Sequence, residues 1–256
     1  MIVCRTPEGH LLFPQSAHAL LAFQLAEHWG NRTTPRPSPR AEVLAAVLLH
    51  DAGWDGRDAE PRLLPGGVLA DFARWPQGEE REKLWHDTLA ASRRRGRYVE
   101  YLVGYHILHL AETYSPGKHL DFVASLRKRL GFLADELAAE RRYAQVFRTG
   151  QDLTNRHIMR VVDAVALSLC LGIERKASVP QAPFRQGLRD LHLTLQKTGI
   201  VRFHPWPFLG RQLTVWVEAR FLPGDLPKTD EQLAVAWENA AARALTFRLA
   251  RLGVAA

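Results

Sequence analysis

The chain has 256 residues, of which 46% are hydrophobic and 24% are charged, and it carries a formal net charge of +7. This length allows one large domain or two small ones with a substantial core, and the composition is ordinary for a globular protein. No apolar run approaches the roughly 20 residues of a membrane-spanning helix. Two cysteines, Cys4 and Cys170, are too few for a disulfide framework.

The start of the chain lacks the charged and apolar segments of a signal peptide, which together with the low cysteine content predicts a cytoplasmic protein. The positive charge comes mainly from scattered arginines, and only residues 93–97 form a run. This charge fits either an anionic partner such as nucleic acid or an Arg-rich surface. Because no known nucleic-acid-binding motif accompanies it, we expect no specific nucleic-acid binding. We also expect no membrane partner, and no oligomeric state is predicted.

The first predicted elements are a β-hairpin over residues 1–14 and a helix from Ala17 to His28. Apolar residues on both sides of a Thr-Pro-Glu-Gly turn indicate the hairpin. His18 stands at the head of the apolar stripe of the helix. A loop over residues 30–40 with three prolines leads to a second helix, Arg40–Asp51, whose apolar residues repeat at helical spacing.

The second helix ends in the segment Leu48-Leu49-His50-Asp51-Ala52-Gly53-Trp54, around which we expect the chain to be organised. Neighbouring helical residues point about 100° apart, so one packing face cannot bury both His50 and Asp51, whereas both can reach a cation at the helix end. Gly53 suits the left-handed position that ends a helix. On its own the dipeptide also fits a core His beside a surface Asp, and His86-Asp87 repeats it.

The middle of the chain is predicted to be helical after an ordered loop over residues 54–78, which is rich in Gly and Pro. Helices are expected next over residues 79–92 and 97–113, followed by a charged amphipathic helix or helix pair over about 119–147. His86 lies on the first of them. His106 lies in the middle of an apolar stripe on the second.

The predicted helix over residues 155–171 is apolar almost all round, so it should be buried. Asp163 lies in its middle. An ionised carboxylate without a partner would cost several kcal/mol there. Asp163 is therefore expected to be paired, protonated or bound to a metal.

After Gly172 the pattern changes from helical to alternating. A loop is expected over 178–187, then strands over Leu191–Gln196, Ile200–His204, Leu213–Phe221 and Leu245–Leu252, with a helix over Thr229–Ala242. The predicted fold is mainly α, a helical bundle with a small antiparallel β-sheet (α+β). The bundle spans residues 15–172, and residues 1–14 and 188–254 form the appended sheet.

Four polar residues on successive predicted helices form a candidate metal site: His18, His50, Asp51 and Asp163. Two imidazoles and two carboxylates suit a divalent ion such as Mn, Fe, Zn, Mg or Ni. Because these residues are far apart in sequence, only a helical bundle could gather them, and bundle cores are known places for such ligand sets.

The order His, His-Asp, Asp resembles the HD-domain superfamily of metal-dependent phosphohydrolases, over roughly residues 15–172. More narrowly, Gln15-x-x-His18, His50-Asp51-x-Gly-Trp54 and Pro205-Trp206-Pro207-Phe208 look like a family of uncharacterised bacterial proteins with an HD-like core. The resemblance implies that the four candidate residues hold one ion. In two-ion members Asp51 would bridge both ions, and His86 and His106 would be additional ligands.

The resemblance implies a divalent-metal-dependent phosphohydrolase acting on a small phosphorylated or anionic molecule, with one or two metal ions. Asp51 and His106 are then the expected catalytic residues. The expected substrate-binding residues are Trp54, which also fits core packing, and Arg93, Arg94 and Arg97. Two alternatives stay open: a non-catalytic, metal-stabilised ligand-binding or scaffold protein, and a di-iron oxidase with six ligands.

Overall fold

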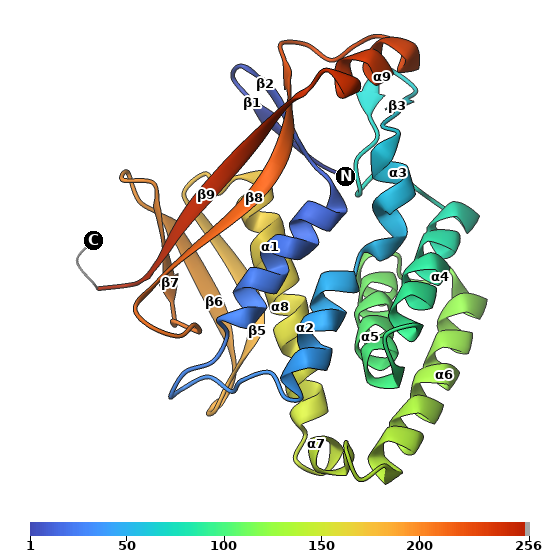
Figure 1. The fold of residues 1–256 in the computed structure, drawn as a ribbon, viewed down its shortest axis with the longest axis vertical. Helices are drawn as coiled ribbons and strands as arrows, with labels where there is room; N and C mark the ends of the chain where they lie inside the picture. Colours follow the sequence, from blue (N-terminus) through green and yellow to red (C-terminus); the bar gives the residue numbers. More distant parts are fainter. Residues whose placement is uncertain (254–256) are drawn as a thin grey trace.

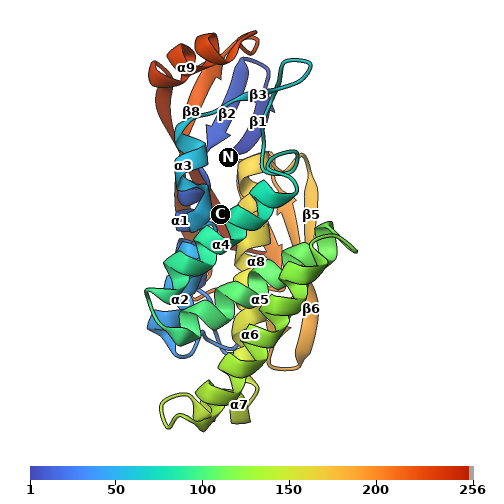
Figure 2. The ribbon, with the colours of Figure 1, turned by 90° about the vertical axis from the view of Figure 1, so that its right-hand side faces the viewer.

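The computed structural model describes residues 1–253 and shows a curled seven-stranded sheet beside several layers of helices (Figure 1). The concave face of the sheet packs against α1 (Gln15–Glu27) and α8 (Gln151–Leu171). Next to these two helices lie α2 (Arg40–Leu49) and α5 (Arg97–Tyr114). Figure 2 shows the molecule from its helical side, with outer helices in front of α8.

The remaining helices complete the helical side and one end of the molecule. They are α3 (Asp55–Ala59), α4 (Glu79–Arg93), α6 (Leu120–Ala139), α7 (Ala144–Arg148) and α9 (Asp230–Glu238). A 3₁₀ turn, η1 (Ala52–Trp54), joins α2 to α3. Both α4 and α6 pack on α5.

The large sheet has the strand order β1-β2-β8-β9-β7-β6-β5. Its strands are β1 (Ile2–Thr6), β2 (Gly9–Phe13), β5 (Lys176–Phe184), β6 (Gly187–Leu195), β7 (Ile200–His204), β8 (Gln212–Pro223) and β9 (Ala241–Arg251). Neighbouring strands are antiparallel except β7 and β9, which are parallel. The two edge strands, β1 and β5, both contact α8, so this helix closes the open side of the curled sheet.

The prediction of a mainly helical bundle with a small antiparallel sheet is wrong. Helices hold 47% of the residues and strands 25%, and the sheet is mixed and large enough to form half a barrel. One cause is β5, where a loop was expected. A bulge between Val179 and Ala182 shifts the register there, and it breaks the alternation by which a strand is recognised.

Most individual elements are confirmed. The N-terminal hairpin, β6, β7, β8, β9 and α9 all form where the sequence predicted them, and Thr229 caps α9 by accepting a hydrogen bond from the Gln232 N–H. Between Glu79 and Leu171 the chain contains helices and turns only. Strands begin at Lys176 rather than near residue 188, and a short hairpin, β3 (Leu63–Leu64) and β4 (Val68–Leu69), lies in the expected loop.

Among residues 1–253, no helix combines the length and the apolar character that crossing a membrane requires.

The loop between α1 and α2 is fastened to α8 by Asn155, whose side chain is fully buried. Its Nδ2 donates to the Ser38 carbonyl and to the Tyr98 hydroxyl, each at 2.7 Å. Its Oδ1 accepts from Gln151 Nε2 at 2.9 Å. One amide therefore ties the loop, α5 and α8 together, two turns of α8 before Asp163.

Candidate metal centre

Five side chains from α1, α5, α8 and the end of α2 meet between the helices, and we call them the His–Asp cluster: His18, His50, Asp51, His106 and Asp163. Asp163 Oδ1 lies 2.8 Å from His18 Nε2 and 3.4 Å from His50 Nε2. Asp51 Oδ2 lies 3.3 Å from His50 Nε2. His106 Nε2 lies 3.7 Å from Asp163 Oδ2. The structure thus brings His18, His50 and Asp163 together as one group, with Asp51 beside His50 and His106 at the edge.

The start of α1 is fixed by Asp58, which positions His18 in the first turn of that helix. The Asp58 carboxylate accepts hydrogen bonds from the Gln15 backbone N–H and from the Met1 amino group, the latter at 2.5 Å. Asp58 is buried, so its carboxylate holds the start of α1 in place and does not face solvent.

Gly53, which follows the His-Asp pair, does not end a helix in the left-handed conformation that the sequence had suggested. It is not among the glycines with positive φ, so it is no left-handed helix stop. A Cβ at Gly53 would collide with the Leu84 carbonyl oxygen and would lie 2.6 Å from Thr88 Oγ1. Glycine therefore allows η1 to approach α4 closely, and this approach fixes the chain that follows Asp51.

Gly53→Ala is expected to lower the free energy of unfolding by about 1–3 kcal/mol, because the methyl group would push η1 away from the α4 backbone. Urea denaturation followed by circular dichroism measures the change. Gly56→Ala is the matched control, since nothing lies within 4 Å of a Cβ there, and it should leave stability unchanged or slightly raised. Equal effects of the two substitutions would contradict the close-approach explanation.

The protonation of His50 is the clearest electrostatic feature of the His–Asp cluster. Its Nδ1–H donates to the Val47 carbonyl at 2.6 Å. Its buried Nε2 has no hydrogen-bond partner among the described residues and faces the carboxylates of Asp51 and Asp163. A bare lone pair facing two carboxylates is repulsive, so Nε2 must carry a second proton or face a cation.

The pKa values of the cluster follow from the same geometry. Burial disfavours the charged form of His50, but Asp51 and Asp163 outweigh it and raise the His50 pKa well above its usual value. Burial would raise the pKa of Asp163, yet the hydrogen bond from His18 and the nearby charge of His50 hold it well below the usual range. For His106 burial dominates and lowers the pKa to about 4, so this imidazole is neutral near pH 7.

The distances in the cluster suit a small divalent ion. Ligand atoms about 2.0–2.2 Å from one ion lie roughly 2.8–3.6 Å from one another, and the Asp163–His18, Asp163–His50 and Asp51–His50 distances fall in that interval. One ligand atom each from His18, His50 and Asp163 lies within 4.8 Å of the other two. The His50–Val47 hydrogen bond is the kind of outer contact that orients a metal-binding imidazole.

His86 lies apart from the cluster. It is exposed on α4, and its ring makes an edge contact with Phe122 at a centroid distance of 5.1 Å. Asp87 beside it pairs with Lys83 at 2.9 Å. The structure therefore does not bring the second His-Asp pair to the site, and the six-ligand set expected for two ions lacks one histidine.

Two of the three arginines expected to bind substrate pair with glutamates outside the cluster. Arg93 donates to Glu100 at 2.9 Å, and Arg97 donates to Glu140 at 2.6 Å. Arg94, directly after α4, is exposed in a surface hollow that is also lined by Leu49 and Ala52, the residues on either side of His50 and Asp51. Trp54 is buried, which agrees with core packing.

A different cation adjoins the cluster and was missed by sequence reasoning. Arg160 precedes Asp163 by three residues on α8 and thus lies on the same side of the helix. Its Nη2 donates to the carbonyls of Pro180 at 2.8 Å and Gln181 at 3.3 Å, in the β5 bulge. Burial lowers the pKa of Arg160 and the nearby Asp163 opposes that shift. The spacing of three residues between Arg160 and Asp163 was the sequence feature that could have predicted this neighbour.

His109 accompanies Arg160 at this side of the cluster. It follows His106 by three residues on α5 and is partly buried. Burial and the charge of Arg160 lower its pKa. The Asp163 carboxylate is therefore flanked by two basic side chains that the sequence had not singled out as a pair.

Comparison with curated proteins and with solved structures finds no match. The model of a family described as "Protein of unknown function (DUF3891)" matches residues 1–224. This span runs from β1 to the end of β8 and contains every member of the His–Asp cluster. Since the match covers most of the 256 residues, the chain belongs to the DUF3891 family.

Proposed function

We propose that the protein is a divalent-metal-dependent phosphohydrolase of the HD type, acting on a small phosphorylated molecule. The observation that carries the proposal is the placement of His50. Its Nδ1–H is committed to Val47, and its Nε2 faces two carboxylates across 3.3 and 3.4 Å. A divalent cation between these atoms would satisfy all three groups at once.

Exposure within the cluster indicates where a substrate would enter. The side chains of Asp51 and Asp163 are 15% and 18% exposed, whereas those of His18, His50 and His106 are 1–2% exposed. Solvent and substrate therefore reach the cluster from its carboxylate side.

Each residue of the cluster would have a separate role in hydrolysis. A bound divalent ion lowers the pKa of water and polarises a phosphoryl oxygen. Asp51, at the exposed side, would accept the proton of the attacking water. His106, neutral near pH 7 because burial lowers its pKa to about 4, can orient a polar group without adding charge. Arg160 would supply positive charge beside Asp163, where a phosphate would lie, and the neighbouring His109 could donate a hydrogen bond.

The proposal is tested with protein purified without chelator, by elemental analysis and by hydrolysis of bis(p-nitrophenyl) phosphate and p-nitrophenyl phosphate. We expect about one ion per chain, turnover that stops on chelation, and recovery when Mn²⁺ is returned. Bound metal without turnover of either probe would favour the non-catalytic alternative. Absence of metal together with no effect of chelator on melting would exclude both.

Arg160→Gln is expected to raise the KM for the phosphoester probe roughly 10- to 100-fold with a smaller change in kcat, because a charge-assisted hydrogen bond to substrate is worth about 1.5–3 kcal/mol. Steady-state kinetics separates the two parameters. Arg148→Gln is the matched control, an exposed arginine on α7. If Arg94→Gln raises KM and Arg160→Gln does not, then Arg94, and not Arg160, binds the phosphate of the substrate.

A further inference from the structure

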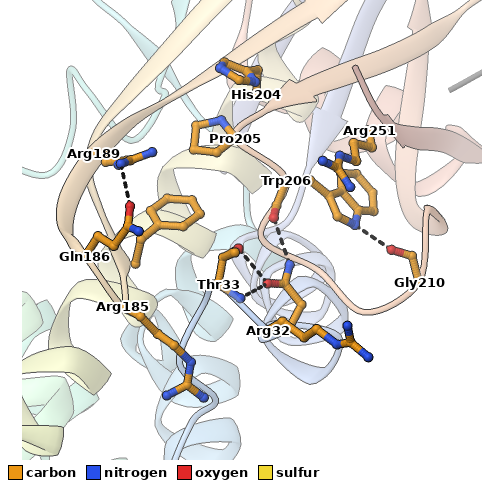
Figure 3. Close-up of a pocket in the computed structure, with 12 residues that line it drawn as sticks. Arg32, Thr33, Arg185, Gln186, Arg189, His204, Pro205, Trp206, Gly210 and Arg251 are labelled. Carbon is orange, nitrogen blue, oxygen red and sulfur yellow. Dashed lines mark hydrogen bonds between the residues drawn. The ribbon is translucent and has the colours of Figure 1, made fainter. Parts of the chain in front are cut away.

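A second site lies at the opposite end of α1 from the His–Asp cluster. It is a pocket of about 620 Å³ between the α1–α2 loop, the β5–β6 turn, the segment after β7 and the end of β9 (Figure 3). We propose that this arginine pocket, named for Arg32, Arg185, Arg189 and Arg251, binds a small molecule that carries two or more phosphate or carboxylate groups.

The arginine pocket is independent of the proposed metal site. His18 lies in the first turn of α1, whereas the pocket begins at Asn31, four residues after that helix ends. A helix of 13 residues is about 20 Å long. No member of the His–Asp cluster lines the pocket, so a ligand there would not contact the metal.

Charge is the first argument for an anionic ligand. Four arginines and His204 line the pocket, and none of its lining residues is acidic. Arg189 donates to Gln186 at 2.9 Å, and none of the four guanidinium groups forms an ion pair with a carboxylate of the described residues. On α4 and α5, by contrast, Arg93 and Arg97 pair with glutamates.

The part of the chain around the pocket adds to its positive electrostatic potential. Residues 173–253 hold twelve Lys and Arg against seven Asp and Glu, which gives +5 of the net +7 of the chain. Like charges around one hollow repel each other, and low-dielectric walls focus their field into it. A multiply charged anion would relieve that repulsion, and its binding would stabilise the fold.

Preorganisation is the second argument. The Asn31 side chain donates from Nδ2 to the Trp206 carbonyl at 2.8 Å and accepts from the Thr33 hydroxyl at 2.9 Å (Figure 3). The Gly30 N–H donates to the Pro207 carbonyl at 2.9 Å, and the Arg185 N–H donates to the Thr33 carbonyl at 2.8 Å. The segments that carry the arginines are thus fixed to one another, and a ligand would not have to order them.

Size and wall chemistry favour a small molecule over a nucleic-acid strand. Small-molecule sites commonly measure about 300–1,000 Å³, and this pocket falls within that interval. Proteins that hold single strands stack bases on exposed aromatic rings. Here the aromatic lining residues Phe184 and Trp206 are buried, and the Trp206 indole N–H is committed to the Gly210 carbonyl at 2.8 Å.

The test uses the full chain, stripped of metal so that the probes cannot act through the His–Asp cluster. Calorimetry and thermal melts at 150 mM salt are run with tripolyphosphate, citrate and a 12-nucleotide single strand. We expect tripolyphosphate, citrate or both to bind and to raise Tm, and the stronger of the two identifies phosphate or carboxylate as the preferred group. The single strand should bind more weakly than either.

The variant Arg32→Gln/Arg251→Gln should weaken binding at least tenfold, while the control pair Arg141→Gln/Arg148→Gln, exposed arginines outside the pocket, should stay within twofold. Asp163→Asn should leave this binding unchanged, which separates the result from the metal proposal. The inference is overturned if neither small anion binds, if the control pair weakens binding equally, or if the single strand binds most tightly and competes with tripolyphosphate.

Discussion

Asp163→Asn should abolish metal binding while the protein stays folded. Asp163 is the one residue whose carboxylate approaches His18, His50 and His106 together among the described residues. Changes in outer contacts alone lower metal affinity roughly 10- to 100-fold, so loss of a direct ligand should lower it by more than about 100-fold. The fold should persist because His50 keeps Asp51 as a charged partner at 3.3 Å.

Metal content, phosphoester turnover and circular dichroism measure this result on one preparation. Asp87→Asn is the matched control, because Asp87 belongs to the other His-Asp pair and contacts only Lys83 at the surface. Chelator should lower the Tm of the unmutated protein and leave that of Asp163→Asn unchanged. Full metal content in Asp163→Asn would show that the ion lies elsewhere.

Asn155→Ala is expected to lower the free energy of unfolding by about 2–4 kcal/mol, the largest effect on stability that we foresee. The substitution leaves the Tyr98 hydroxyl and the Ser38 carbonyl without the amide that both contact at 2.7 Å. A buried polar group without a partner costs about 1–3 kcal/mol. Loosening of the α1–α2 loop should also reduce metal affinity, because α1 and α2 carry His18 and His50.

Urea denaturation with constant m-values measures the loss of stability. Asn239→Ala is the matched control, since Asn239 is exposed and its amide bonds only to the Val235 carbonyl. It should change stability by less than about 0.5 kcal/mol. A similar small effect of Asn155→Ala would mean that water replaces the buried amide.

The sequence predicted the His–Asp cluster because its members break local patterns. Asp163 is a carboxylate in a helix that is apolar all round, and His106 is an imidazole on an apolar stripe. Such residues need polar partners inside the fold, and each of these helices supplies partners for the polar residues of the others. His86 breaks no pattern, since charged residues from Glu79 to Lys83 surround it on its helix, and the structure leaves it exposed.

The surroundings of Arg93, Arg94 and Arg97, the arginines expected to bind substrate, could not be predicted this way. A run such as residues 93–97 shows where positive charge lies in the chain but not which carboxylate neutralises it. Glu100 and Glu140 do so from α5 and the end of α6, and only the packing of those helices reveals it. Arg160 differs from these arginines. It belongs to no run of positive charge, and helical spacing alone puts it beside Asp163.

The size of the sheet escaped prediction for a related reason. Alternation marks single strands, and β6 to β9 were found by it. The order in which strands pair depends on contacts across long stretches of chain, such as the parallel pairing of β7 with β9. The β5 bulge, with Gln181 at a φ of 58°, removed the local pattern as well.

The placement of β9 sets the order in which the sheet can be assembled during synthesis. β9 lies between β8 and β7, so without it the sheet divides into β1-β2-β8 and β7-β6-β5. The N-terminal hairpin meets β8 where Leu12 pairs with Arg220, about 200 residues later. At roughly 5–20 residues per second the open edge of β2 therefore waits on the order of 10–40 s for its partner. The two halves join only when residues 241–251 have been made, so we expect late, slow folding dominated by long-range pairing.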